Sequence, residues 1–437
     1  MKKITVLTIL FACTAAAFAG GVDTKSNLST GYYRNPSRNT ESKRPEAVFY
    51  NIAGTGFMAN GLYFEAGNQF VFKEYSDDYA VTGKTYKDNE NVYLYPNADI
   101  VFKKDRLSFF GGFAVAGGGG ELDYKDGTGA TYALVYSVSK PLITSIVNAT
   151  EPSLTEAQKA AKVNQITQGI ASSHSLKVYS VTYGFTLGSS YDVTDSISIA
   201  AAARVLYGHQ ILSLTDSNTN FVAYNGSDEL RAESFGAGIG GIFGVQYKPV
   251  SDLDLTVQYK TLTKLSMKYS TLKGTFAKNA LGADEGDTFD NDMPPELNLG
   301  AGYRVIDPVY VSASFNYYFN SQANITNTVA RKDYNYDDSW ECALGVDWDV
   351  NSKLTASLGG LYSKAGSTES ENNVFSPVLD NIAVGTGVEV KAVKNFTFTG
   401  GLMYTRYFEK DYNSNSVALE LNKKAFMCTL GATWKPF

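Results

Sequence analysis

Residues 62–73 read LYFEAGNQFVFK, and their side chains alternate in character along the segment. Successive side chains of an extended strand point to opposite faces. One face is apolar except at Asn68 and consists of Leu62, Phe64, Ala66, Phe70 and Phe72. The opposite face is mixed and includes the polar residues Glu65, Gln69 and Lys73. This pattern predicts a β-strand with one face against an apolar environment.

The same alternation returns along the rest of the chain, for example in 196–207 and 426–435. A soluble sandwich can contain one such half-buried strand, but repetition over the whole chain favours a barrel. We predict about fourteen strands, near residues 61–74, 91–103, 106–117, 175–188, 195–212, 231–247, 253–269, 295–305, 309–320, 339–350, 353–364, 380–391, 395–407 and 425–437. Most are about ten or more residues long, the length that a tilted strand needs to cross a bilayer.

The connections between these strands alternate between two classes. Short turns lie at 103–106, 188–195, 248–252, 305–308, 350–353 and 391–395. Long polar loops lie at 213–230, 270–294, 321–338, 365–379 and 408–424. Outer-membrane barrels have short periplasmic turns and long extracellular loops. The sequence therefore predicts an all-β fold, a transmembrane antiparallel β-barrel of about 14 strands over residues 61–437.

Composition supports a barrel and excludes several other classes. The chain contains 30 Tyr, 25 Phe and 40 Gly, and aromatic residues are enriched at both edges of a barrel's lipid-facing band. A net charge of −6 argues against nucleic acid as a partner. The two histidines, His174 and His209, leave little for a metal site or for histidine-based catalysis. We expect no enzyme activity, no cofactor and no metal.

The first residues, MKKITVLTILFACTAAAFA (1–19), have the pattern of a secretory signal. Two lysines precede an apolar core, and the segment ends in an A-x-A cleavage site, so the mature chain is expected to start at Gly20. The alternative, lipidation at Cys13, leaves a very short apolar run before the cysteine. Export and the barrel pattern together predict the outer membrane of a Gram-negative-type bacterium.

Residues 20–60 precede the first predicted strand, and their polar part, 20–46, has no strand or helix period. Their first part is polar, and 47–58 (AVFYNIAGTGFM) is apolar and interrupted by Gly54 and Gly56. As a periplasmic tail this segment would expose its large apolar side chains. A barrel of fourteen strands is wide enough to leave a channel unless something fills it, so we predict that 20–60 forms a plug in the lumen.

The loop 120–174 is far longer than the other loops and contains a predicted helix. Ser153 and Glu156 form a capping-box pattern, good helix formers follow, and Gly169 is a reasonable stop. The upstream segment 134–147 is strongly apolar for an extracellular loop. These pieces either pack on each other as a lid or form an external platform that catches hydrophobic solutes.

Several motifs in this order resemble the FadL/TodX (OMPP1) family of outer-membrane transporters for long-chain fatty acids and other hydrophobic compounds. They are NPSR (35–38), AVFYNIAGTGFMANG (47–61), GNQFVF (67–72), FFGGFAVAGGGGELDY (109–124) and MPPELNLGAGYRVIDP (293–308). Asn51, Ala53 and Gly54 match the family's plug motif, whereas Ile52 stands where the family commonly has proline.

The resemblance implies passive transport of a hydrophobic molecule through a plugged barrel. The molecule would bind an external groove, move to a tighter site inside, and leave sideways through an opening at a kinked third strand. Gly111 and Gly112 lie in the middle of that predicted strand, and Gly117 and Gly118 lie near its end. Interior glycines commonly mark bulges. The alternative for 117–120 is an ordinary strand end that runs into a loop.

A ligand of this class needs an apolar slot, because burying one methylene is worth ~0.8 kcal/mol, and one cation suffices to orient a carboxylate. By alternation Arg204, Lys260 and Arg304 point inward. Their alternative role is ion pairing in the lumen with residues such as Asp254 and Glu296. The expected partners are fatty acids, aromatics or detergent, together with outer-membrane lipid, and the barrel is expected to be a monomer.

Three rival functions remain at this stage. A porin-like channel for small solutes needs neither an apolar plug nor an apolar 134–147 segment. An outer-membrane enzyme would need a nucleophile–base–orienter set, and the spacing around Ser173 and His174 shows none. An adhesive barrel is compatible with the long polar loops.

Overall fold

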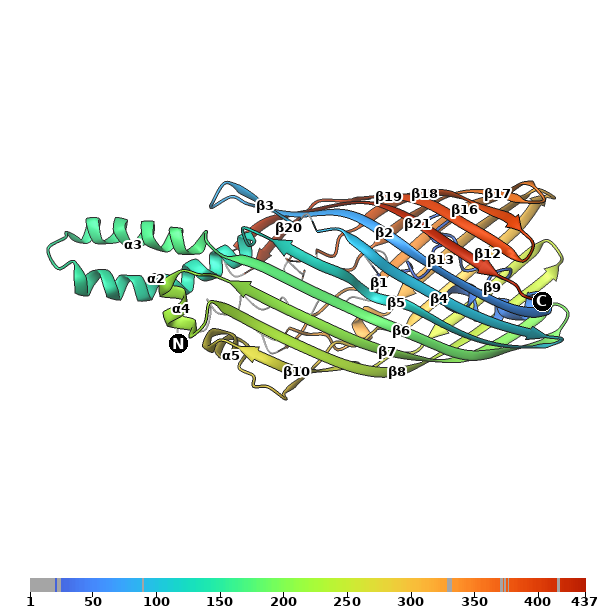
Figure 1. Cartoon of the computed structure of the whole chain (residues 1–437), viewed down its shortest axis with the longest axis horizontal. Helices are drawn as coiled ribbons and strands as arrows, with labels where there is room; N and C mark the ends of the chain where they lie inside the picture. The colour runs from blue at the N-terminus through green and yellow to red at the C-terminus, as the bar shows by residue number, and fades with distance from the viewer. Residues whose placement is uncertain are drawn as a thin grey trace.

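The computed structural model describes residues 20–21, 25–88, 90–327, 332–369, 372, 375, 377–414 and 417–437. The predicted signal segment 1–19 lies outside these described residues. The described chain forms an elongated barrel with helices projecting from one end, and the C-terminus lies at the opposite end (Figure 1).

Fourteen long strands build the wall within the described residues, and β9 and β10 together count as one of them. They are β2 (Gly61–Tyr79), β4 (Val92–Lys104), β5 (Leu107–Tyr124), β6 (Ser175–Thr194), β7 (Ile197–Thr215), β8 (Glu229–Val250), β9 (Leu253–Lys260) with β10 (Ser266–Lys273), β12 (Glu296–Ile306), β13 (Val309–Tyr318), β16 (Ser339–Asn351), β17 (Leu354–Lys364), β18 (Asn381–Val393), β19 (Phe396–Tyr407) and β21 (Val417–Trp434). Neighbouring strands pair antiparallel, and β21 pairs with β2 from Phe64–Trp434 to Asp78–Glu420, which closes the barrel. The predicted fold class is confirmed.

Shorter elements lie inside the barrel or at its extracellular end. The short strands are β1 (Gly20–Gly21), β3 (Lys84–Asp88), β11 (Thr288–Asp290), β14 (Thr326–Asn327), β15 (Lys332–Asp333) and β20 (Lys410–Ser414). The helices are α1 (Ala47–Tyr50), η2 (Ile52–Phe57), α2 (Gly129–Thr150), α3 (Glu156–Ala171), α4 (Thr219–Asn225), α5 (Thr275–Leu281) and η3 (Asn320–Gln322). Among the described helices, none is both long and apolar enough to cross a membrane.

The predicted strand 253–269 is wrong as one continuous element. The β8–β9 ladder ends at the pair Ile242–Lys260, and the β8–β10 ladder begins at Ala237–Ser266. Between them the hydroxyl oxygen of Thr261 accepts a hydrogen bond from the Gly241 amide at 2.9 Å. A side chain therefore replaces a backbone partner at the interruption, which alternation alone does not reveal.

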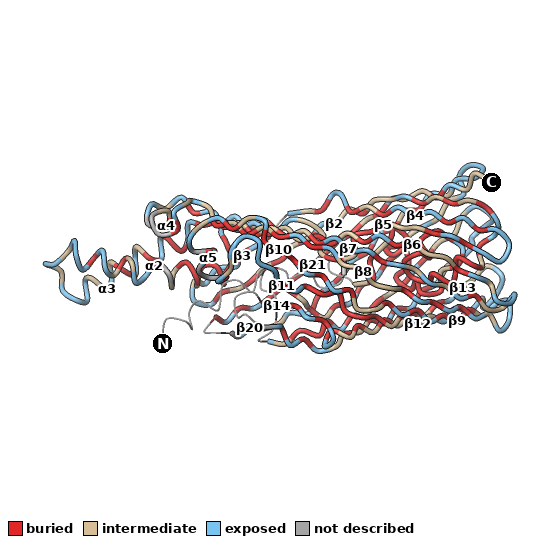
Figure 2. The backbone as a smooth tube through the Cα atoms, turned by 90° about the horizontal axis from the view of Figure 1, so that it is seen from below, coloured by how far each residue is buried: buried red, intermediate tan, exposed pale blue. Residues whose placement is uncertain are grey.

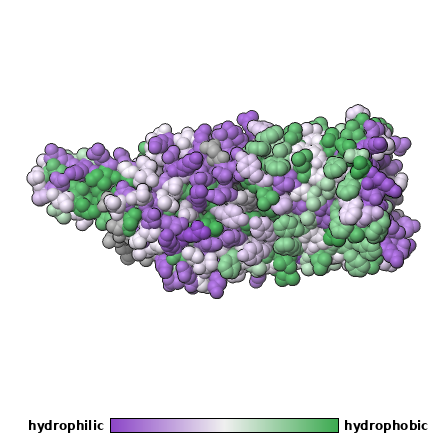
Figure 3. Space-filling model, viewed as in Figure 1, coloured by the Kyte–Doolittle hydropathy of each residue, from purple (hydrophilic) through white to green (hydrophobic). Residues whose placement is uncertain are grey.

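The outward face carries the apolar side chains that the alternation predicted. Figure 3 shows hydrophobic residues gathered over the half of the barrel that lies away from the helices. Exposed aromatic side chains form two belts around the barrel. The periplasmic belt includes Phe102, Tyr191, Tyr247, Tyr303, Trp348, Phe396 and Trp434, and the extracellular belt includes Phe72, Tyr93, Tyr207, Phe235, Tyr259, Tyr404 and Phe426.

The long loop folds as a helical hairpin, α2 and α3, that projects beyond the barrel (Figure 1). The predicted capping box is wrong by two residues, because Thr155 caps α3 and Gln158 completes the box. Gly169 lies inside α3, which continues to Ala171. The apolar segment 134–147 is part of α2.

The segment 25–60 lies inside the barrel, where Figure 2 shows buried backbone gathered towards the periplasmic end. We call this segment the plug. Inward-facing glycines from several strands lie against it, and we call them the wall glycines: Gly67, Gly112, Gly244, Gly300, Gly345, Gly359, Gly385, Gly401 and Gly431. A Cβ atom at each position would lie closer to a plug atom than van der Waals contact allows. The plug fits because the wall lacks side chains there.

Gly345 on β16 and Gly360 on β17 provide a matched test of this fit. A Cβ at Gly345 would overlap the Asn35 side chain of the plug, whereas the nearest atom to a Cβ at Gly360 is 3.6 Å away on the lipid face. Gly345→Val should displace the plug at a cost of about 1–3 kcal/mol or more, and Gly360→Val should be neutral. Protease cleavage within 25–60 measures the displacement. Equal protection of both variants would contradict the role of the wall glycines.

Candidate functional site

The predicted plug residues Asn51, Ile52, Ala53 and Gly54 are buried against the wall. The Asn51 amide nitrogen donates to the Gln246 side chain of β8 at 2.8 Å, and its oxygen accepts from the Gly54 amide at 3.2 Å. Asn51 therefore joins the turn to the wall. Ile52, at the position where the family commonly has proline, packs into the space left by the wall glycine of β8.

Gly54 and Gly56 allow close packing of the plug. A Cβ at Gly54 would overlap the Glu41 carbonyl, and one at Gly56 would overlap Asp192 and Ser198. Neither glycine has a positive φ, so backbone conformation does not require glycine at these positions. Lack of space for a side chain does. The sequence predicted glycines that bend the plug, and the structure shows glycines that admit neighbouring groups.

Two plug arginines form ion pairs with carboxylates of the wall. Arg34 lies 3.0 Å from Asp347 on β16 and 3.3 Å from Glu389 on β18. Arg44 lies 3.1 Å from Glu65 on β2 and also contacts Glu389. The side chain of Glu65 is fully buried, and the side chains of both arginines are almost fully buried. These pairs join the plug to three separated strands.

A second set of pairs holds the plug together internally. Arg38 lies 2.7 Å from Glu46, and Arg44 lies 3.8 Å from the same carboxylate. Burial alone raises the pKa of the Glu46 carboxyl, but Arg38 and Arg44 outweigh burial and lower this pKa below its ordinary value. Glu46 is therefore ionised at neutral pH, and its contribution to stability is present there and lost only under strong acid.

The inner surface of the barrel changes in character along its length. The extracellular half is mostly aromatic or aliphatic, with buried Tyr75, Leu122, Leu176, Val178, Leu212, Leu214, Leu230, Met267, Leu272, Leu419 and Leu421. It also contains buried charged side chains on the β2 side: Lys73, which pairs with Asp88, together with Asp77 and Lys423. The periplasmic half, around the plug, is polar, with buried Ser108, Ser190, Ser198, Gln246, Gln258, Asn298, Ser312, Ser314 and Ser357. We call the mostly apolar inner surface of the extracellular half the apolar chamber; it ends on a polar, plugged base.

The three predicted ligand cations do not form one site. Arg204 and Lys260 are both buried and share one carboxylate, since Glu296 lies 3.5 Å from Arg204 and 2.8 Å from Lys260. Arg304 lies near the periplasmic turn, 3.4 Å from Asp349. The ion-pairing alternative with Glu296 is therefore present in the structure for the first two cations. Arg304 lies too far along β12 to join them.

The predicted kink at Gly111 and Gly112 is wrong. Both residues pair in regular register with β4 on one side and β6 on the other. The irregularities of β5 lie in 115–120, where its register with β6 shifts twice. Gly118 there has a φ of 69°, a left-handed conformation that strains residues with a Cβ. Gly117 and Gly118 belong to this bulged stretch and do not end the strand.

The wall separates at this bulge. The β4–β5 ladder ends at the pair Asn97–Ala114, and we call the stretch beyond it, between 92–96 of β4 and 115–120 of β5, the window. Tyr95 spans the window and its hydroxyl donates to the Val115 carbonyl at 3.1 Å. The strand β1 pairs in parallel with β5 at Gly117 and Gly118. Backbone groups in the window are thus covered by a tyrosine and by two glycines at the expected mature N-terminus.

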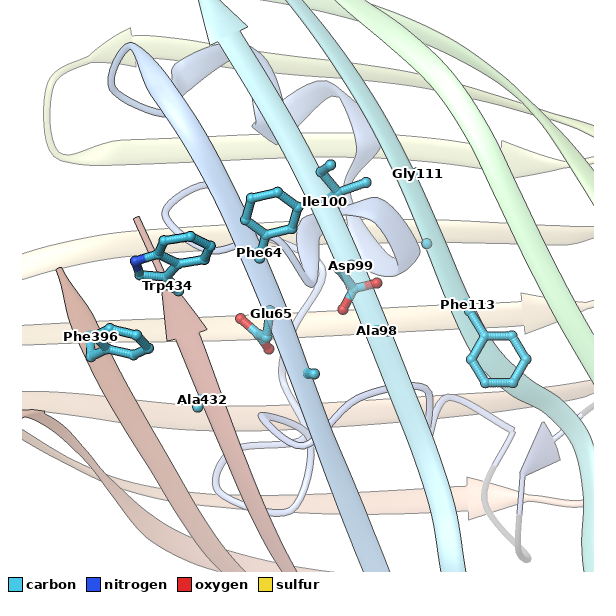
Figure 4. Close-up of a pocket in the computed structure, with 12 residues that line it drawn as sticks. Phe64, Glu65, Ala98, Asp99, Ile100, Gly111, Phe113, Phe396, Ala432 and Trp434 are labelled. Atoms are coloured by element: carbon cyan, nitrogen blue, oxygen red, sulfur yellow. The ribbon is translucent and has the colours of Figure 1, made fainter. Parts of the chain in front are cut away.

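An apolar groove of about 620 Å³ lies on the outer wall at the periplasmic end of the window. Its lipid-facing lining consists of Phe64, Ala66, Ala98, Ile100, Gly111, Phe113, Phe396, Ala432 and Trp434. Figure 4 shows Phe396, Trp434 and Phe64 towards one end, with Phe113 at the other. Small residues on adjacent strands form its floor, because Ala432, Ala66 and Ala98 pair across β21, β2 and β4.

A family model described as outer membrane protein transport protein (OMPP1/FadL/TodX) matches residues 104–434. The chain belongs to this family. It is an outer-membrane transport protein, and the sequence resemblance is confirmed.

Solved structures with the same fold include members of this family. A Pseudomonas aeruginosa FadL homologue is 14% identical with a TM-score of 0.66, covering 96% of this chain and 100% of that chain. The P. putida toluene transporter TodX is 16% identical with a TM-score of 0.62, covering 93% and 99%. The Ralstonia pickettii toluene transporter TbuX is 14% identical with a TM-score of 0.56, covering 93% and 97%. A search of curated proteins found no match.

Sequence reasoning named Gly117 and Gly118, which lie in the window, but it missed Tyr95 and the role of the wall glycines in this FadL/TodX-type barrel. Tyr95 reads as one more aromatic residue of a strand, and its role depends on where β5 leaves β4. The wall glycines do leave a signal, since several interrupt the inward face at mid-strand, as Gly67 and Gly300 do. A glycine at such a position indicates close approach of another backbone.

Arg44 provides a test of the ionic attachment of the plug. Arg44→Gln leaves Glu65 and Glu389 as buried carboxylates without this cation, which typically costs about 3–5 kcal/mol. We expect a loosened plug and a higher single-channel conductance in planar bilayers. Arg106→Gln is the control, because the exposed pair Arg106–Asp195 is worth at most about 1 kcal/mol. Unchanged conductance in the Arg44 variant would show that packing alone seats the plug.

The foot of the helical hairpin should respond to pH through His174. This buried imidazole lies 2.7 Å from the Thr131 hydroxyl at the start of α2, and burial lowers its pKa to about 4. Between about pH 6.5 and 4, the His174 imidazole binds a proton when the foot of the hairpin is open but stays neutral when it is packed. Acidification therefore favours opening. Hydrogen exchange of α2, corrected for intrinsic rates, should increase from pH 7 to pH 5. His174→Gln should remove this dependence, and its persistence would assign the effect elsewhere.

Proposed function

We propose that this protein carries hydrophobic molecules passively from the exterior into the apolar chamber and then sideways through the window into the outer membrane. The observation that carries the proposal is the change from an apolar chamber to a polar, plugged base. An apolar solute that enters from outside gains burial in the chamber, at ~0.8 kcal/mol for each methylene. It would lose that gain if it continued through the polar half.

The window supports a sideways route. It lies beside the apolar chamber, and Val92 on β4 and Gly120 on β5 approach each other at its extracellular end. Movement of β1 and of the Tyr95 side chain would uncover it. A solute that leaves there meets the apolar groove on the lipid face, so it remains among hydrocarbon and aromatic groups throughout its exit.

The hairpin supports capture from outside. Figure 3 shows a hydrophobic patch on the projecting helices, and Ile146 on α2 is exposed. An exposed apolar patch on an element that faces water usually marks a binding site. The hairpin thus takes the role of the external platform, with a hydrophobic solute as that partner.

The relatives support the cargo class and a non-enzymatic role. The names of TodX and TbuX describe them as toluene transporters, and we extend a hydrophobic cargo, aromatic or aliphatic, to this chain.

We also propose that one barrel acts alone in the lipid bilayer. Closure of β21 on β2 leaves the sheet no terminal strand that a second copy could extend.

Deleting Ala116 and Gly119, the two extra residues of the β5 bulges, should restore a continuous β5 and close the window. We expect a folded barrel that still binds a fluorescent hydrophobic probe but no longer delivers it into the membrane of proteoliposomes. The control is Gly400→Ala on the lipid face of β19, where an added Cβ has no neighbour closer than 4.0 Å. Full delivery by the deletion variant would exclude the window as the exit.

A sugar-swelling assay on the same proteoliposomes separates this transport from a porin-like channel. The plugged barrel should admit no sugar. Rapid swelling would overturn the proposal in favour of general diffusion.

A further inference from the structure

A row of polar side chains crosses the apolar chamber at one height. Ser180 on β6 pairs directly with Gln210 on β7, which pairs with Ser234 on β8. Thr182 lies one inward position below Ser180 on the same strand. Gln210 shares its strand face with inward-facing Arg204, opposite the exposed outward residues of β7. We call Ser180, Thr182, Gln210 and Ser234 the polar row.

Apolar or glycine residues border the polar row on both sides along these strands. Towards the exterior the next register-paired residues are Val178, Leu212 and Ala232. Towards the periplasm they are Gly208 and Gly236, with Met267 packed over them. The polar row is therefore a narrow polar band inside an apolar chamber.

The polar row has unused hydrogen-bonding capacity. Both polar atoms of the Gln210 amide, the Thr182 hydroxyl and the Ser180 hydroxyl are buried and have no hydrogen-bond partner. Gln210 is 6% exposed and Thr182 is 1% exposed. A buried polar group without a partner costs about 1–3 kcal/mol, and folded proteins pair the great majority of such groups. Several adjacent unpaired groups in one band indicate a place for a ligand.

The position of the polar row connects it with the transport route. Ser180 pairs with Gly120 and Thr182 pairs with Gly117, both in the bulged stretch of β5 that borders the window. A molecule that moves from the chamber to the window passes this band.

The charge at this height decides the ligand class. Among the described inward positions of β6, β7 and β8 from the polar row to the extracellular strand ends, the side chains are uncharged. The inward cation farther down β7, Arg204, is already paired with Glu296 and donates to the Thr263 hydroxyl at 3.0 Å. Across the window, the buried Lys73 ammonium of β2 donates to the Glu121 carbonyl and is already paired with Asp88 at 2.5 Å. A carboxylate would therefore lose its hydration here without gaining a counter-ion from these strands or an unpaired one from Lys73. An amide and hydroxyls suit a neutral group that both donates and accepts.

We propose that the polar row binds the neutral hydrogen-bonding group of an otherwise apolar cargo, such as the hydroxyl of a phenol or of a long-chain alcohol. The substrate class is thus hydrophobic alcohols and phenols in preference to carboxylates. This inference rests on the proposed function, because it assumes that the chamber binds the transported molecule.

Three probes of nearly equal size separate the possibilities: 2-naphthol, 2-methylnaphthalene and 2-naphthoate. Binding to the full chain in nanodiscs is measured by equilibrium dialysis at pH 7, with empty nanodiscs correcting for partition into lipid. The wild-type protein should bind 2-naphthol about two- to tenfold more tightly than 2-methylnaphthalene, the range that one net hydrogen bond supports. It should bind 2-naphthoate most weakly.

The double variant Gln210→Leu/Thr182→Val should bind 2-naphthol and 2-methylnaphthalene equally, with the methylnaphthalene affinity unchanged or increased. Thr405→Val is the matched control, because Thr405 is a fully buried threonine on β19, whose hydroxyl also lacks a partner. This control should keep the 2-naphthol preference. The double variant should unfold at the same temperature or higher, since it removes unpaired buried groups, whereas a purely structural polar row predicts destabilisation.

The outcomes distinguish this inference from the proposed function. Equal binding of all three probes, tightest binding of 2-naphthoate, or a 2-naphthol preference that survives in the double variant would overturn the polar row alone. Failure of the wild-type chamber to bind any of the probes would overturn the proposed function and this inference with it.

Discussion

Satisfaction of backbone hydrogen bonds in hydrocarbon is the constraint on which the rest of this structure depends. Within lipid, a sheet has to close because an open edge would leave amide and carbonyl groups unpaired. The β2–β21 ladder supplies that closure. The window is the place where neighbouring wall strands separate, and there Tyr95 and β1 supply substitute partners. The same constraint requires that the exit that we propose through the window have a cover that can move.

The plug depends on two kinds of complementarity with the wall. Glycines at mid-strand let its backbone approach, and buried carboxylates on β2, β16 and β18 meet its arginines. Removing water from these ion pairs is expensive unless both partners are present, so the pairs fix where the plug sits more than they stabilise it. A plug held by paired charges over a polar base can seal the barrel to water while the chamber above stays apolar.

Alternation predicted the barrel and its strand number, because period two is a local property and each strand repeats it, and the lengths of the connections predicted its orientation. Alternation also placed Arg204 and Lys260 inward. The sequence named Glu296 as one possible ion-pair partner but could not choose between ion pairing and ligand binding, since Glu296 reaches the two cations only through the register of β12 against β9. The irregular stretch of β5 lies at 115–120 and includes Gly117 and Gly118 but not Gly111 and Gly112. Register and bulges are set by pairing between strands far apart in sequence.

The two kinds of polar group in the lumen have different physical meanings. Arg204, Lys260 and Glu296 are buried charges that satisfy one another, so a ligand carboxylate would have to displace an existing partner. Gln210 and Thr182 are buried neutral groups with unused capacity, and a ligand hydroxyl would displace no existing contact. In the transport that we propose, selectivity follows from this difference, because the groups that a passing molecule can satisfy are those that the folded protein leaves unpaired.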